Sequence, residues 1–222
     1  MFIPLKDLNP SRTYPFVNIT LMFANVVIFL YQVGLEATLP RRAFDALLLS
    51  YSTVPARFPA YLAGHVSFEV SFVPLLTSMF LHSGFLHLAG NMLFLWIFGD
   101  NVEDFFGHVG YFFFYLVCGI GAGLLHVVFN FHSNIPAVGA SGAISGVMGA
   151  YMLLYPRARI LTLVFIFPLP VPAVVFLGLW YVMQFLAGLS TIGVKVTGGV
   201  AVWAHVGGFL LGMLLTTMVR RR

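Results

Sequence analysis

The sequence predicts an all-α membrane protein, a bundle of six transmembrane helices with both termini in the cytoplasm. Three observations support this fold class. Apolar residues make up 60% of the 222 residues and charged residues only 8%, whereas a soluble domain carries about 25% charged residues. Several stretches without any charged side chain reach the ~20 residues that a helix needs to cross a membrane. The alternating ten-residue segments of a membrane barrel are absent from the sequence, which favours helices.

The charge-free stretches divide a single membrane domain, residues 1–222, into six expected helices. The first stretch is too long for the apolar core of a signal peptide, so we expect it to be retained as a membrane span. The proline-rich segment 168–172 leaves too few apolar residues before it to cross the membrane. The long first loop, residues 34–84, is rich in aromatic residues and prolines and is expected to lie at the membrane interface. The expected helices are residues 16–33, 85–104, 109–130, 141–155, 173–189 and 200–219.

The basic residues predict the orientation of these helices. Six spans put both termini on one side of the membrane. With the termini inside, seven of the 11 basic residues lie on the inner side and four on the outer side. Because inner loops carry an excess of lysine and arginine, this distribution favours the orientation with both termini inside.

Three polar or glycine-rich stretches interrupt the apolar segments, at residues 82–91, 137–146 and 204–208. Polar side chains are costly inside a membrane, so each stretch is a candidate functional site. Counting 1.5 Å per residue from the inner helix ends places Ser141, His205 and His87 roughly 20–22 Å above the inner boundary. The three side chains therefore fall in one layer, roughly 8–10 Å beneath the outer face of a ~30 Å core.

The helix that begins near Ser141 is short, because Pro156 follows only fifteen residues later. The loop before it must therefore dip into the protein. Ser141 is expected at a helix N-terminus, where unpaired backbone N–H groups and the helix dipole favour negative charge. Glycines four residues apart allow two helices to pack closely: Gly142 with Gly146, and Gly208 with Gly212. Such packing would bring His205 to Ser141.

These residue types can form a site for nucleophilic catalysis. A neutral imidazole within hydrogen-bond reach of a serine hydroxyl can accept its proton, which makes Ser141 the candidate nucleophile and His205 the candidate base. The negative charge of a tetrahedral intermediate needs fixed donors, and we expect them from the Asn91 amide, the His87 ring and the backbone N–H of the serine. No third member of a triad is evident, so we predict a Ser–His dyad with no cofactor and no metal.

Other catalytic motifs do not fit the sequence. Ala143 breaks the G-x-S-x-G pattern, and the H-E-x-x-H zinc motif is absent. We interpret His126 and His132 as meeting water or headgroups at the outer end of the third helix. Because hydrolysis requires water below the outer face, we also expect a cavity, roofed by residues 131–140 and by the loop around Lys195.

Together the motifs resemble the rhomboid family of intramembrane serine proteases, and the resemblance covers nearly the whole chain. The matching stretches are G-x-S-G at residues 139–142, the base motif at 204–208, H-x4-H-x3-N at His82, His87 and Asn91, and E-x3-G at 103–107. The resemblance implies a six-helix rhomboid core with Ser141 as nucleophile and His205 as base. His87 and Asn91 would lie on the oxyanion side. The residues that support the motifs are Gly139, Gly142, His82 and Gly208.

The resemblance also implies cleavage of membrane-anchored proteins in or near their transmembrane segments. The expected partners are transmembrane protein substrates and the lipid bilayer, with no nucleic acid. We expect a multi-pass protein of the bacterial inner membrane whose active site opens to the outer side. Two features depart from the family pattern. Some members carry a tyrosine four residues after the nucleophile, where this chain has Ser145, and the first loop lacks a Trp-Arg pair.

Two alternatives remain open. A catalytically inactive rhomboid-like protein would bind membrane proteins without cutting them, although both members of the dyad are present. A transporter would also place histidine and asparagine inside a membrane. It predicts internal repeats, which the sequence does not show.

Overall fold

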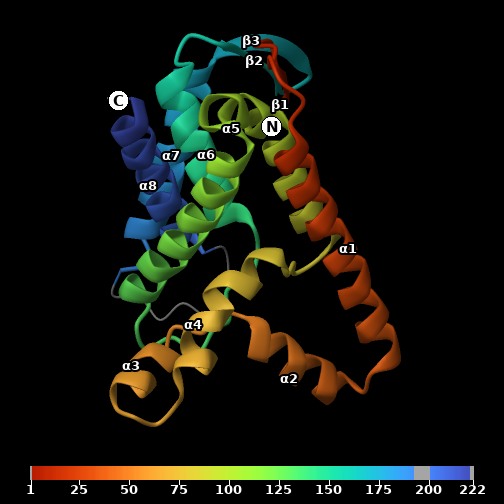
Figure 1. Ribbon diagram of the computed structural model, residues 1–222, viewed down its shortest axis with the longest axis vertical. Coiled ribbons are helices and arrows are strands. Elements are labelled where there is room, and N and C mark those ends of the chain that lie inside the picture. The colour runs from red at the N-terminus through yellow and green to blue at the C-terminus, as the bar shows by residue number, and fades with distance from the viewer. Residues whose placement is uncertain (1, 193–200, 221–222) are drawn as a thin grey trace.

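The computed structural model describes residues 2–192 and 201–220. It is mostly helical, with a small sheet at the end where both described chain ends lie and short helices at the opposite end (Figure 1). The elements are β1 (Phe2–Asp7), α1 (Phe16–Thr38), α2 (Arg41–Tyr51), α3 (Arg57–Leu62), α4 (Phe68–Thr77), a 3₁₀ turn (Ser78–Phe80), α5 (Phe85–Phe129), α6 (Ser141–Leu154), β2 (Arg159–Val164), β3 (Phe167–Pro172), α7 (Ala173–Leu189) and α8 (Val202–Arg220).

Three helices of the described chain are long and apolar enough to cross a membrane, namely α1, α5 and α8. The 45 residues of α5 contain a break at Gly107, whose φ of 70° and ψ of 163° are not helical. Glycine tolerates this positive φ because it has no Cβ. The break divides α5 into two helices, close to the expected pair 85–104 and 109–130. With 14 and 17 residues, α6 and α7 are shorter than a full membrane span.

The core of the bundle is α6, in which ten of 14 residues are buried. Its backbone touches the backbone of α8 at the predicted glycines. A Cβ atom added to Gly208 would lie 2.0 Å from the Gly142 carbonyl oxygen, and one added to Gly212 would lie 2.0 Å from the Gly146 carbonyl oxygen. Small residues let helices approach this closely in a membrane protein. The close packing expected from the glycine spacing is therefore confirmed.

The expectation of a purely helical protein is wrong at one end of the molecule. There β1, β2 and β3 form an antiparallel sheet in the order β1-β2-β3. The sequence indicates only that the region before Pro168 is too short to span the membrane, and it predicts no structure for residues 2–7. The backbone groups of such short strands are satisfied only when the strands pair with each other. Because β1 and β2 lie far apart in the sequence, their pairing is not visible from the local residue pattern. The prolines of β3 lack an N–H and suit its position at the sheet edge.

The expected first loop, residues 34–84, is also different from its prediction. The first helix continues to Thr38, and α2, α3 and α4 follow it. Each of these three helices buries an apolar side chain: Phe44 in α2, Phe58 in α3 and Leu75 in α4. Short amphipathic helices have a weaker sequence signal than a charge-free membrane span, so the sequence analysis does not predict α2, α3 and α4. The expected start of the last helix at residue 200 and the loop around Lys195 lie outside the described residues.

Candidate active site

Ser141 is the first residue of α6, and the preceding backbone is held by the first-loop region. Thr53 exchanges two backbone hydrogen bonds with Ala137, at 3.1 and 2.8 Å, and the Gly139 N–H donates to the Ser78 carbonyl at 2.8 Å. Gly139 has a φ of 120°, which side-chain-bearing residues rarely adopt. These contacts fix the backbone that leads into the helix. Because Ser141 is the first helical residue, its backbone N–H has no partner within the helix.

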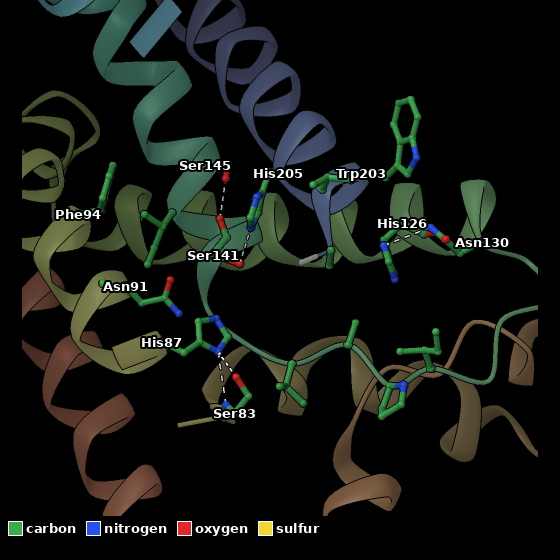
Figure 2. Close-up of a pocket in the computed structure, with 18 of the residues that line it drawn as sticks. Ser83, His87, Asn91, Phe94, His126, Asn130, Ser141, Ser145, Trp203 and His205 are labelled. Carbon is green, nitrogen blue, oxygen red and sulfur yellow. Dashed lines mark hydrogen bonds between the residues drawn. The ribbon is translucent and has the colours of Figure 1, made fainter. Parts of the chain in front are cut away.

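His205 lies on α8 and faces Ser141, as Figure 2 shows. Its Nε2 is 2.8 Å from the Ser141 Oγ, and its Nδ1 is 2.8 Å from the Gln184 Oε1. The His205 side chain is buried, with 8% of its surface exposed. The glycine contacts between α6 and α8 thus bring together the two side chains that the sequence placed at one depth.

His87 and Asn91 approach the same place from the first half of α5 and lie beneath Ser141 in Figure 2. A Cβ atom on Gly139 would lie 2.8 Å from the His87 Nε2 and 3.6 Å from the Asn91 Nδ2. The His87 Nδ1 is 3.0 Å from the Ser83 Oγ. Its other ring nitrogen points toward Gly139 in residues 131–140, the serine loop, which leads into Ser141. The Asn91 Nδ2 is buried without a hydrogen-bond partner among the described residues. An unpaired buried donor is costly unless a ligand uses it.

His82 lies behind His87 instead of facing the reacting groups. The two ring centroids are 5.2 Å apart, and the His82 side chain is fully buried. Gln32 holds its backbone, donating to the His82 carbonyl at 2.7 Å and accepting from the His82 N–H at 3.2 Å. Burial, followed by the nearby His87, lowers the pKa of His82 to about 4. A neutral His82 is consistent with a packing role.

A cavity of about 730 Å³ reaches Ser141, His205, His87 and Asn91. Residues 133 and 135–138 form one wall, in accord with the expected position of the 131–140 segment. The expectation that His126 meets water stays a prediction. This side chain lines the cavity, and the Asn130 Nδ2 donates to the His126 carbonyl at 2.9 Å.

Two side chains of α7 contact the His205 ring, and the sequence analysis predicts neither contact. Gln184 touches the His205 ring edge, and the Trp180 ring lies 5.7 Å from the His205 ring with an angle of 38° between them. Gln184 is the only amide or charged side chain between Ala173 and Leu189. A lone polar residue in an apolar span is a functional signal, and applying it here would have found this residue.

Ser145, one turn after Ser141, does not compete for the base. Its hydroxyl donates to the Ser141 carbonyl at 2.6 Å, and 1% of its surface is exposed. Among the described residues no three histidine, cysteine, aspartate or glutamate side chains gather in a way that could hold a metal ion.

The chain matches known proteins over most of its length. A family model described as "Rhomboid domain" matches residues 69–222. "Rhomboid protein 1, mitochondrial" of Saccharomyces cerevisiae is 31% identical over 164 residues, which cover 69% of this chain and 44% of the yeast protein. "RHOMBOID-like protein 6, mitochondrial" of Arabidopsis thaliana is 34% identical over 145 residues, which cover 64% of this chain and 41% of the plant protein.

A bacterial relative matches a shorter region. "Rhomboid protease GluP" of Bacillus subtilis is 44% identical over 78 residues, which cover 35% of this chain and 15% of that protein. The chain therefore spans less than half the length of these relatives. Two of the three are named as mitochondrial, so the comparisons do not support the expected bacterial inner membrane. They do support the apolar helices as those of an integral membrane protein. The chain belongs to the rhomboid family.

Proposed function

We propose that this protein is an intramembrane serine protease that cleaves membrane-anchored proteins in or near their transmembrane segments. The observation that carries the proposal is the 2.8 Å distance between the His205 Nε2 and the Ser141 Oγ at the start of α6. A serine beside a neutral imidazole is an activated nucleophile. The cavity that reaches this pair supplies space for a peptide bond and for water.

The chemistry proceeds through an acyl-enzyme. His205 accepts the Ser141 hydroxyl proton as the oxygen attacks the substrate carbonyl, and returns that proton to the leaving amine when the peptide bond breaks. A water molecule then attacks the ester, with His205 again accepting the proton and passing it back to the serine oxygen. No cofactor and no metal takes part in these steps.

The oxyanion of each tetrahedral intermediate needs preorganised donors. The Ser141 N–H is available at the helix start, and the helix dipole there favours negative charge. The unpaired Asn91 Nδ2 supplies a second donor. His87 supplies a third from the ring nitrogen that Ser83 does not engage. Gly139 lets these side chains approach, because any Cβ at that position would collide with the His87 ring.

The site belongs, in this proposal, to a six-helix core with both termini in the cytoplasm. The six helices of this core are α1, the two halves of α5, α6, α7 and α8, and the 14 residues of α6 cross only part of the membrane. The two described chain ends lie at one end of the molecule, and the serine loop faces the other end, toward α4 (Figure 1). Together with the excess of basic residues near the termini, this arrangement supports an active site that opens to the outer side. The partners are transmembrane substrates and the bilayer, with no nucleic acid.

The proposal is tested by labelling the purified protein with a fluorophosphonate and by following cleavage of a transmembrane substrate in liposomes. Wild type is expected to label at Ser141 and to cleave. Ser141→Ala and His205→Ala should do neither while still inserting into the membrane, because neither change adds volume. Ser145→Ala is the matched control and should keep substantial activity. A wild type that binds the substrate without labelling or cleavage would instead be an inactive relative.

A further inference from the structure

We infer that Gln184 of α7 is a positioning residue that fixes the tautomer and orientation of His205. The inference deepens the proposed function and rests on it. The sequence offered no third member for the dyad, yet the His205 Nδ1 has a partner in the structure, the Gln184 Oε1 at 2.8 Å. This contact lies on the opposite side of the ring from the Ser141 Oγ, which is 2.8 Å from Nε2. The imidazole therefore bridges the two side chains.

The bridge selects one of two tautomers. A neutral imidazole carries one N–H and one lone pair. An amide oxygen can only accept a hydrogen bond, so its contact with Nδ1 places the proton there. Nε2 then keeps its lone pair toward Ser141 and can take the hydroxyl proton. The other tautomer would point an N–H at the serine and could not act as its base.

Packing does not explain a glutamine at this position. Only four residues of α7 are buried, namely Ala173, Phe176, Leu177 and Gly188. Most of the helix is apolar and exposed, so an amide there is costly unless it is paired. Its partner is the one side chain whose proton position decides whether the proposed reaction can occur.

The same helix touches the ring a second time. Trp180 lies one turn before Gln184, and its ring is 5.7 Å from the His205 ring. From α6, the Ser145 hydroxyl is occupied by the Ser141 carbonyl at 2.6 Å. The orientation of His205 is thus controlled from α7, with Gln184 at the ring edge and Trp180 beside it.

The first test reads the tautomer without any activity. Nitrogen-15 NMR of the ring of His205, in detergent and above the pH at which the ring is protonated, distinguishes a protonated Nδ1 from a protonated Nε2. Wild type is expected to show a protonated Nδ1, and Gln184→Leu a mixture of tautomers. A wild-type ring protonated at Nε2 would overturn the inference, because the amide would then present its NH₂ group to the histidine.

The second test separates positioning from folding. Gln184→Leu should lower kcat on the order of 10²-fold, the lower end of what general-base catalysis contributes, with little change in KM. Gln184→Glu restores an acceptor and should recover much of the turnover. Its carboxylate stabilises the imidazolium, so the acid limb of the activity profile should move to higher pH. The ionisable side chains that act on His205 are His87 and His126, and both are unchanged in these variants.

Met183→Leu is the matched control, because Met183 directly precedes Gln184 on α7 and is 53% exposed. It should match wild type in turnover, pH profile and thermal midpoint. An active wild type with a Gln184→Leu variant of equal kcat and unchanged pH profile would overturn the inference alone. A wild type that neither labels with fluorophosphonate nor cleaves would overturn the proposed function, and a catalytic role for Gln184 with it.

Discussion

The helices α8 and α7 contact the candidate site in opposite ways. Contact between α8 and α6 is backbone against backbone, with three positions where an added Cβ would lie 2.0–2.2 Å from a carbonyl oxygen across the interface, at Gly208, Gly212 and Gly149. By contrast, α7 buries only four residues and reaches His205 through two long side chains. The distance between the serine and the histidine is therefore set by a rigid interface. The direction of the imidazole is set by a helix with few buried contacts.

The largest effect is expected from Gly208→Ala, which adds a methyl group inside the rigid interface between α6 and α8. The new methyl group would lie 2.0 Å from the Gly142 carbonyl oxygen, so α6 and α8 must separate. Overpacking of this kind lowers the free energy of unfolding by about 1–3 kcal/mol, and the separation should abolish cleavage. Thermal unfolding in detergent and the substrate assay measure the two losses.

Gly178→Ala on α7 is the control for that change. No atom lies within 4 Å of a Cβ added at this position, and alanine in a helix interior is favoured over glycine by roughly 0.5–1 kcal/mol. Stability should stay equal or rise, with activity intact. Equal damage from the two substitutions would show that the difference between the interfaces is not real.

A smaller loss is expected from Asn91→Ala, which leaves both interfaces unchanged and removes one donor of the candidate oxyanion site. Turnover should fall about 10²–10³-fold, with a thermal midpoint close to that of wild type, because the lost Nδ2 group has no hydrogen-bond partner among the described residues. Steady-state kinetics separates kcat from KM. A large loss of substrate binding at unchanged kcat would make Asn91 a substrate contact instead.

Trp180→Leu tests the contact between α7 and the His205 ring, and its effect should be modest. An aromatic pair contributes about 0.5–1.5 kcal/mol beyond burial, so losing its contact with His205 should lower kcat by up to about tenfold. The thermal midpoint should change little, because α7 is mostly exposed. Leu179→Ala, on the exposed face of the same helix, should be silent in both measurements. Destabilisation by Trp180→Leu as strong as that by Gly208→Ala would show that α7 and α8 do not differ in how they support the site.

The smallest effect concerns the sheet, which joins the two regions because β3 runs directly into α7 and Asp7 of β1 accepts a 2.8 Å hydrogen bond from the Tyr151 hydroxyl of α6. Burial, assisted by the nearby Asp100, raises the pKa of Asp7 from 3.8 to about 6. Because the folded value is the higher one, this group's contribution to stability is fully present below about pH 4 and is lost as the pH rises through 6.

Asp7→Asn should remove that part of the pH dependence. The difference in thermal midpoint between wild type and variant is therefore expected to change between pH 4 and 6 and to be flat above pH 7. A difference that is constant over the whole range would show that the folded-state pKa of Asp7 is not raised.

The sequence was most informative where the physical requirement is local. Charge-free length predicted the long apolar helices α1, α5 and α8. Glycines four residues apart predicted the close contact of α6 with α8. Counting the helical rise put Ser141 and His205 at one depth, and their side chains meet. The catalytic roles of these residues stay predictions.

The features that were missed depend on partners far away in the chain. The residues of β1 gain their strand only from β2, more than 150 positions later, and the pattern of residues 2–7 alone does not reveal that pairing. Gln184 carries a signal of its own, as the one amide in the apolar residues 173–189, but the sequence does not predict what it contacts. Its partner on α8 is fixed by how two helices rotate against each other, which a single amide in an apolar run does not specify.

The Thr53–Ala137 pairing has a consequence for how the protein can be divided. The region that matches the rhomboid family begins at residue 69, yet the backbone that leads into Ser141 is paired with Thr53, and Gln32 holds the backbone of His82. A fragment trimmed to the family boundary would lack both partners. The region that matches the family is thus smaller than the set of residues that hold the backbone around the candidate site.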